Sequence, residues 1–152
     1  MVNTILVTDD NVLDNAIIRN YLYKERYNIL SALNGREALE LIESRTVNLI
    51  LLDMVMPVMD GYEFMKEFSK TPYYKEIPII ITVSPEGVEN IENFLEYEIF
   101  DYIIKPLGHI NSLILVNKIK TALKHRNLIV DLNKATKIID NLSKNEGSYK
   151  TS

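Results

Sequence analysis

The chain has 152 residues, enough for one domain with a well-buried core and an extension, and too few for two full domains. Its hydrophobic content of 47% is ordinary for a globular protein, and its formal net charge of -4 argues against nucleic acid as a direct partner. There is no cysteine, which excludes disulfides, zinc–thiolate sites and thiol catalysis. The first apolar run, residues 5–7, is too short for a signal peptide or a membrane span, so we expect a cytoplasmic protein without membrane contact.

Five short apolar runs alternate with stretches of helical spacing. The runs are rich in Ile, Leu and Val without polar alternation, which is typical of parallel strands covered on both faces. We expect strands at residues 4–8, 27–32, 48–52, 77–83 and 102–104. Repeated strand–helix units predict an α/β fold with a doubly wound, five-stranded parallel sheet over residues 1–124.

Helical spacing between these runs predicts four helices. The third spans about residues 62–69 and the fourth about residues 86–96. The buried faces that we expect are Val12, Ala16, Ile17 and Tyr21 in the first helix, and Ala38, Leu39, Leu41 and Ile42 in the second.

Charged side chains follow the strands where ligands bind in such sheets, at their carboxyl ends. Asp9 and Asp10 follow the first strand, Asp53 ends the third and Lys105 ends the fifth. Carboxylates without His or Cys favour Mg²⁺, and a nearby lysine suits a phosphoryl group with an aspartate as nucleophile. Singly, each residue also has a structural interpretation as a helix cap, a turn residue or part of a surface loop.

The segment DMVMPVMDG at residues 53–61 strongly resembles the phosphoacceptor loop of response-regulator receiver domains, the CheY-like superfamily of two-component signalling. The Asp-Asp pair and the segment DYIIKP at residues 101–106 match the same family, and the resemblance covers about residues 3–124. It implies a flavodoxin-like (βα)5 fold. It also implies a switch that takes its phosphoryl group from a histidine kinase or a phosphotransfer protein in a Mg²⁺-dependent reaction.

The resemblance assigns a role to each matching residue. Asp53 would be the phosphoacceptor, and Lys105 would pair with the phosphoryl oxygens. Mg²⁺ would be held by Asp10 directly, by Asp9 largely through water, by Asp53, and by the backbone carbonyl of Val55. No turnover of an external substrate is expected, only self-phosphorylation from small phosphodonors and self-dephosphorylation.

The sequence departs from the family at the switch hydroxyl that usually ends the fourth strand. Counting thirty residues from Asp53 and twenty-two back from Lys105 leads to Val83 both times. If Val83 faces the site, strand alternation turns Thr82 away from it. Ser84, just past the strand, is then the better substitute, and we expect the coupling to be weakened or rerouted through it.

Three other positions bear on switching. Tyr102 stands where the family places an aromatic ring that moves inward on activation, and its alternative interpretation is an ordinary amphipathic tyrosine of an edge strand. Val55 and Pro85 flank the site without a donor or acceptor to orient water, which predicts slow self-dephosphorylation.

From residue 109 to residue 146 there is no Gly or Pro, which predicts one long final helix. Its first apolar stripe fits packing on the sheet, and its second has the alternating spacing of a coiled-coil seam. We divide the chain into a receiver domain (1–124), a helical extension or coiled-coil linker (125–146) and a flexible tail (147–152). The extension would form a homodimer or lead to an output domain, or else fold back or fray. The two stripes are Val116, Ile119 and Leu123, then Leu128, Leu132, Ala135, Ile139 and Leu142.

The predicted function is a phosphoacceptor switch that relays its state through the face of the fourth helix, fifth strand and fifth helix. Two alternatives stay open: a degenerate receiver that acts as a protein-interaction or dimerisation module, and an aspartyl-nucleophile phosphatase. Such phosphatases generally have a second aspartate two residues after the nucleophile, where this chain has Val55. An FMN-binding module is more distant, because no Ser/Thr/Gly-rich phosphate loop follows the first strand.

Overall fold

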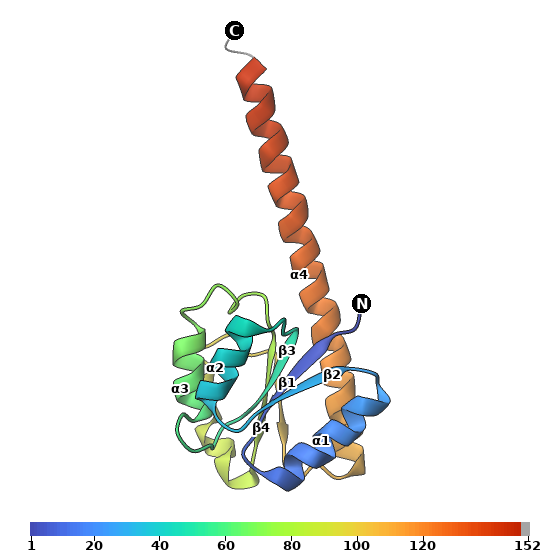
Figure 1. The fold of residues 1–152 in the computed structure, drawn as a ribbon. Coiled ribbons are helices and arrows are strands. Elements are labelled where there is room, and N and C mark those ends of the chain that lie inside the picture. The colour runs from blue at the N-terminus through green and yellow to red at the C-terminus, as the bar shows by residue number, and fades with distance from the viewer. Residues whose placement is uncertain (150–152) are drawn as a thin grey trace.

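The computed structural model describes residues 1–149, and its strands form one parallel sheet in the order β2-β1-β3-β4-β5 (Figure 1). This order confirms the predicted doubly wound, flavodoxin-like sheet, in which the winding direction reverses between β1 and β3. The predicted strand ends are correct to within two residues. The strands are β1 (Thr4–Thr8), β2 (Asn28–Ala32), β3 (Leu49–Asp53), β4 (Ile79–Val83) and β5 (Asp101–Ile104).

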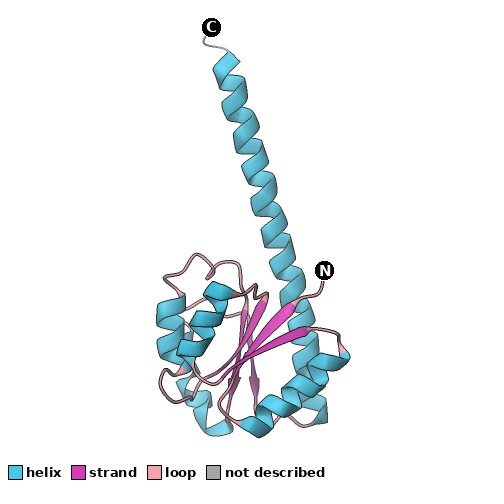
Figure 2. Ribbon diagram, viewed as in Figure 1, coloured by secondary structure: helices cyan, strands magenta, loops and turns pink. Residues whose placement is uncertain are grey.

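Helices cover both faces of the sheet (Figure 2). On one face lie α1 (Val12–Lys24) and the first part of α4 (His109–Tyr149). On the other lie α2 (Gly35–Ser44), α3 (Gly61–Phe68) and the 3₁₀ helix η1 (Pro85–Phe94). Strand side chains alternate between these two cores, so Leu52 and Val83 pack on the α2–α3 side and Leu51 and Ile80 on the α1–α4 side.

Three helices begin at the carboxyl edge of the sheet, each on a capping side chain. The cap oxygen accepts a hydrogen bond from a backbone N–H of the first turn, which satisfies a donor that the helix leaves unpaired. Gly61, after the cap of α3, is required by close packing, because a Cβ there would lie 2.6 Å from the carbonyl oxygen of Asp53. The caps are Asn11 for α1, Asn34 for α2 and Asp60 for α3.

The predicted buried face of α1 is wrong. Its buried side chains are Asn15, Ile18 and Leu22, whereas Val12 is 77% exposed. Helical spacing fits both the predicted and the observed buried residues, since α1 carries apolar residues on more than one side. The buried face is hard to recognise in the sequence because it includes the polar Asn15. An exposed apolar surface therefore remains on α1, and it consists of Val12, Leu13 and Ile17.

The predicted fourth helix forms as the 3₁₀ helix η1 instead of an α-helix. Its backbone bonds join residues three apart, as from Gly87 N–H to the Ser84 carbonyl (2.9 Å) and from Leu95 N–H to the Glu92 carbonyl (3.1 Å). Glycine, asparagine and β-branched residues disfavour the α-helix here. A ten-residue 3₁₀ run is long for this geometry, whose hydrogen bonds are poorer than those of an α-helix.

Helix α4 spans 41 residues, about 60 Å, and only its first part packs on the sheet (Figure 1). Leu115, Ile119 and Leu123 are buried, while every side chain from residue 131 to residue 148 is exposed. The helix continues through Gly147 to Tyr149, so the first part of the predicted tail is helical and residues 150–152 lie outside the described residues. None of the helices described is both long and apolar enough to cross a membrane.

Candidate functional site

Three carboxylates meet at the carboxyl edge of the sheet. Asp9 and Asp10 follow β1, Asp53 ends β3, and one oxygen of each lies within 4.8 Å of the others. Asp9 and Asp53 are buried, whereas Asp10 is exposed. The Asn11 N–H donates to Oδ1 of Asp9 (2.8 Å), which fixes that carboxylate at the start of α1. The sheet thus gathers acidic side chains that would repel one another without a cation.

Lys105 reaches this cluster from the end of β5. Its Nζ lies 2.9 Å from Oδ2 of Asp9, 3.0 Å from Oδ2 of Asp14 and 3.4 Å from Oδ2 of Asp53. Burial alone would lower the pKa of Lys105, but the hydrogen bonds to Asp9 and Asp14 and the charge of Asp53 raise it above its ordinary value. The ammonium is therefore a permanent positive charge within the cluster.

Asp53 is held in an environment that disfavours its charge. Burial, and to a lesser extent the charge of Asp9, raises the pKa of its carboxyl to about 6 against the lowering effect of Lys105. The Val55 N–H donates to Oδ1 at 3.4 Å, a long contact that favours the carboxylate only slightly. A cation bound in addition to Lys105 would stabilise the charged form of the Asp53 carboxyl.

Asp14 is a member of the cluster that sequence reasoning missed. It lies in the first turn of α1 and forms an ion pair with Lys105 that is nearly as short as that of Asp9. The available signal was its position in the first turn of the helix that begins directly after Asp9 and Asp10. Asp14 gives Lys105 a third acidic partner and restrains the ammonium at the α1 side of the cluster.

The loop after Asp53 is held by backbone contacts. The Gly61 N–H donates to the Met54 carbonyl (3.0 Å), and the Gly35 N–H donates to the Met59 carbonyl (2.9 Å). Val58 has a φ of 66°, an unfavourable value for a β-branched residue, and the Met59 N–H bridges over it to the Pro57 carbonyl (2.7 Å). The loop therefore stores strain close to Asp53.

The end of β4 differs from the sequence expectation. Val83 is fully buried in the core of the α2–α3 side, opposite to the side on which Asp53 falls by alternation after Leu52. Thr82 pairs in register with Asp53 and shares its side of the sheet. By this alternation Thr82, and not Val83, lies on the side of the sheet that Asp53 faces, so the condition under which Thr82 would turn away from the site is not met. Ser84 caps η1 without a side-chain cap bond, so its hydroxyl is not committed to the helix start.

Tyr102 lies on the edge strand β5 with a side chain that is 43% exposed. The ammonium of Lys118 lies 5.7 Å from the centre of its ring, donates to its backbone carbonyl (3.0 Å) and pairs with Asp101 (2.9 Å). The ring is thus on the surface, in contact with α4 through Lys118.

The donor set of this edge fits Mg²⁺. Three carboxylates supply hard oxygen ligands within the span of one ion, and no histidine lies among them. Burial, and to a lesser extent the charge of Asp9, raises the pKa of Asp53, so a bound cation would stabilise its charged form. Asp9, Asp10 and Asp53 are the residues that would hold the ion.

Comparison with known proteins identifies the class to which this fold and site belong. The family model described as "Response regulator receiver domain" matches residues 5–120. The two-component response regulator ORR5 of Oryza sativa is 34% identical over 104 residues, which cover 68% of this chain and 78% of that protein. The "Probable cyclic di-GMP phosphodiesterase" of Vibrio cholerae is 33% identical over 105 residues, 69% of this chain and 24% of that protein.

A solved structure gives the same result. The CheY-like response regulator receiver domain protein of Methanospirillum hungatei superposes with a TM-score of 0.74 at 27% identity, covering 84% of this chain and 98% of that chain. The chain therefore belongs to the response regulator receiver domain family, as the motif resemblance predicted. Its role is that of a receiver domain in two-component signalling, a class that signals and is generally not enzymatic.

Proposed function

We propose that the chain is a phosphoacceptor switch in which Asp53 receives a phosphoryl group from a histidine kinase or a phosphotransfer protein. The observation that carries this proposal is the contact of one lysine, Lys105, with Asp53 and with two further carboxylates at the carboxyl edge of the sheet. That arrangement gives a carboxylate nucleophile a fixed positive charge beside it.

In the reaction, an Oδ of Asp53 attacks the phosphorus of the donor. A new O–P bond forms, the P–N bond to the donor histidine breaks, and the bond electrons leave with the imidazole. Lys105, already within 3.4 Å of Asp53, neutralises oxygens of the transferred group. Asp14 and Asp9 hold the ammonium in place, so they act as positioning residues.

Asp9, Asp10 and Asp53, together with the backbone carbonyl of Val55, are the ligands that we assign to Mg²⁺. The bound ion would supply charge neutralisation for the phosphoryl oxygens. The side chain of Val55 is 74% exposed and therefore imposes no packing constraint on its carbonyl. Neither Val55 nor Pro85 carries a side-chain donor or acceptor that could orient water, which supports slow self-dephosphorylation.

The exposed apolar surface on α1, formed by Val12, Leu13 and Ile17, suits the phosphodonor. It begins two residues after Asp10, so a partner bound there would reach the carboxyl edge. Exposed apolar side chains gathered beside a reactive site are typical of protein-binding surfaces. Such a pathway would operate in the cytoplasm, where we place the chain.

Phosphorylation would be reported through η1, β5 and the packed part of α4. Ser84 is our candidate for the hydroxyl that meets the phosphoryl group, because no cap bond occupies it. The register of Asp53 with Thr82 favours Thr82 as a second candidate. Tyr102, beside Lys118 of α4, would carry the change toward that helix.

Two substitutions separate the candidate hydroxyls, Ser84→Ala and Thr82→Val. With beryllofluoride and Mg²⁺, the variant lacking the contacting hydroxyl should lose the amide shift changes of η1 that the wild type shows, while the other variant keeps them. If both variants respond like the wild type, neither hydroxyl couples the site to η1. The result would then favour a coupling that is weakened and not rerouted.

The projecting part of α4 would act as a dimer helix or as a linker to an output domain. Its apolar side chains recur every three and four residues, the spacing of a two-stranded coiled coil, and all are exposed. These residues are Leu128, Leu132, Ala135, Ile139 and Leu142.

The test is incubation with acetyl phosphate and Mg²⁺, followed by mass measurement of the intact chain. We expect a gain of one phosphoryl group that Asp53→Asn abolishes and that Asp60→Asn, an acidic helix cap in the same loop, leaves intact. Turnover of an external phosphoester would support the phosphatase alternative instead. No response to acetyl phosphate or beryllofluoride would support a degenerate interaction module.

A further inference from the structure

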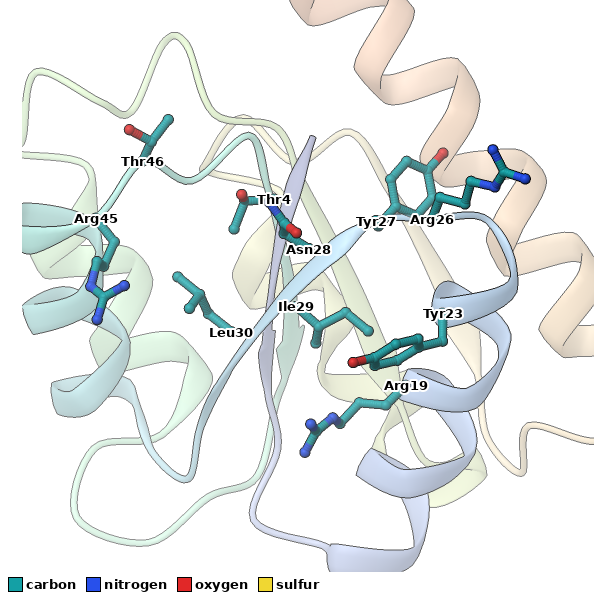
Figure 3. A pocket seen from close by; sticks show the side chains of 10 residues that line it. All are labelled: Thr4, Arg19, Tyr23, Arg26, Tyr27, Asn28, Ile29, Leu30, Arg45 and Thr46. Atoms are coloured by element: carbon teal, nitrogen blue, oxygen red, sulfur yellow. The ribbon is translucent and has the colours of Figure 1, made fainter. Parts of the chain in front are cut away.

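A hollow of about 740 Å³ lies along the outer edge of β2, toward the amino ends of the strands and away from Asp53 (Figure 3). Arg19, Arg26 and Arg45, three of the five arginines in the chain, line it, and no acidic residue does. Within residues 1–149 their guanidinium groups form no ion pair or hydrogen bond. A concentration of unpaired positive charge in a chain of net charge -4 suits an anionic partner.

The floor of this hollow is the open edge of a β-sheet. Among the described strands, β2 pairs with β1 alone. The Asn28 N–H donates to the carbonyl of Asn3, just before β1 (2.9 Å), and the Asp9 N–H, just after β1, donates to the Ala32 carbonyl (3.1 Å). Backbone groups alternate sides along a strand, so the N–H and C=O groups of Ile29 and Ser31 point outward. The edge therefore offers main-chain donors and acceptors beside the arginines.

The arginines lie on both faces of this edge. Arg19 belongs to α1, on one face of the sheet, and Arg45 ends α2, on the other. Figure 3 shows Arg45 and Thr46 to one side of β2, and Arg19 and Tyr23 to the other. A compact anion would have to straddle the edge to meet both guanidinium groups, whereas an added strand projects alternate side chains to both faces.

We propose that the β2 edge binds an extended acidic peptide segment by strand addition. The segment's backbone pairs with Ile29 and Ser31, its carboxylates pair with Arg19 on the α1 face and Arg45 on the α2 face, and its apolar side chains lie against Tyr23. Arginine binds carboxylates in a bidentate geometry, which gives such a contact direction as well as charge. This surface is separate from the Asp53 site and from the projecting part of α4.

The test is a titration of the full chain with an eight-residue peptide of glutamate, valine and threonine. Two adjacent glutamate pairs in the peptide place carboxylates on both strand faces. We expect saturable shifts of the Ile29 and Ser31 amides and their protection from hydrogen exchange. Arg19→Gln with Arg45→Gln should weaken binding about tenfold, by loss of two charge-assisted contacts, while Arg36→Gln, an exposed arginine of α2 outside the hollow, should leave it unchanged.

Two further probes decide between strand addition and a simple anion site. The same peptide with alternate backbone amides methylated keeps its charge but cannot pair with a strand, and inorganic tripolyphosphate has charge without a strand. Strand addition predicts that neither protects Ile29 and Ser31. Equal binding of the methylated peptide or of tripolyphosphate would overturn the proposal in favour of a small-anion site, and absence of peptide binding would overturn it outright.

Discussion

The carboxyl edge of the sheet and the projecting part of α4 both carry groups without matching partners. At the edge these groups are carboxylates, and on α4 they are apolar side chains. At the edge, Asp9, Asp14 and Asp53 surround Lys105, leaving more negative charge than one ammonium compensates. Along residues 131–148 the side chains are all exposed, and a regular apolar stripe lies among them. The first region holds more carboxylates than cationic side chains, and the second holds apolar side chains that nothing in the described chain covers. One receiver domain thus leaves charged groups and apolar side chains without partners at two separate places.

The largest expected effect tests the helix side of this comparison. Leu132→Glu combined with Ile139→Glu would place charges in an apolar seam, so the self-association expected of the wild type should disappear. Sedimentation equilibrium over a range of concentrations measures it. Asn133→Glu with Lys137→Glu, on the opposite side of the helix, adds the same residues and should leave the dimer intact. If the wild type is monomeric throughout, the seam serves a different partner.

The next effect concerns the edge. Lys105→Met removes the cation from three carboxylates, and we expect a loss on the order of 3 kcal/mol in the free energy of unfolding without Mg²⁺. Added Mg²⁺ should recover part of it, because a second cation neutralises the same oxygens. Urea unfolding measures both. Lys118→Met, which removes a more exposed pair with Asp101, should cost below about 1 kcal/mol; equal losses would contradict a special role for Lys105.

The third effect uses the pH dependence of Asp53. Its pKa of about 6 in the folded chain exceeds the ordinary value of 3.8, so the folded state favours the protonated carboxyl. That stabilisation is present below about pH 4 and is lost as the pH rises through 6. Without Mg²⁺, Asp53→Asn should therefore be more stable than the wild type by about 3 kcal/mol at pH 7, and the difference should become small near pH 4. A constant difference between these pH values would exclude charge as its cause.

The smallest effect concerns strain beside the site. Val58→Gly removes a β-branched residue from a φ of 66°, and the relief should exceed the entropy cost of glycine by about 1 kcal/mol. Thermal unfolding measures the gain. Val55 lies in the same loop but has no positive φ, so Val55→Gly should destabilise the chain instead. Stabilisation by both glycines, or by neither, would show that backbone strain at Val58 is not stored in the loop.

Much of the fold was predictable because buried parallel strands are unmistakable in the sequence. Asp9, Asp53 and Lys105 were also predictable, since each lies at the carboxyl end of a strand and these ends meet at one edge of the sheet. The face of α1 was not, because a buried asparagine replaces an apolar residue there. The ion pair of Asp14 depends on how α1 leaves the sheet, and the arginine-lined edge of β2 depends on three segments that meet only in space.

We propose that Asp53 carries the phosphoryl group, and borohydride reduction after treatment with acetyl phosphate and Mg²⁺ identifies the modified residue. Borohydride converts an aspartyl phosphate to homoserine, which peptide sequencing by mass spectrometry locates. We predict homoserine at position 53 alone, and none when Mg²⁺ is withheld. Homoserine at another aspartate, or a phosphoryl group that resists borohydride on a serine or threonine, would contradict the account.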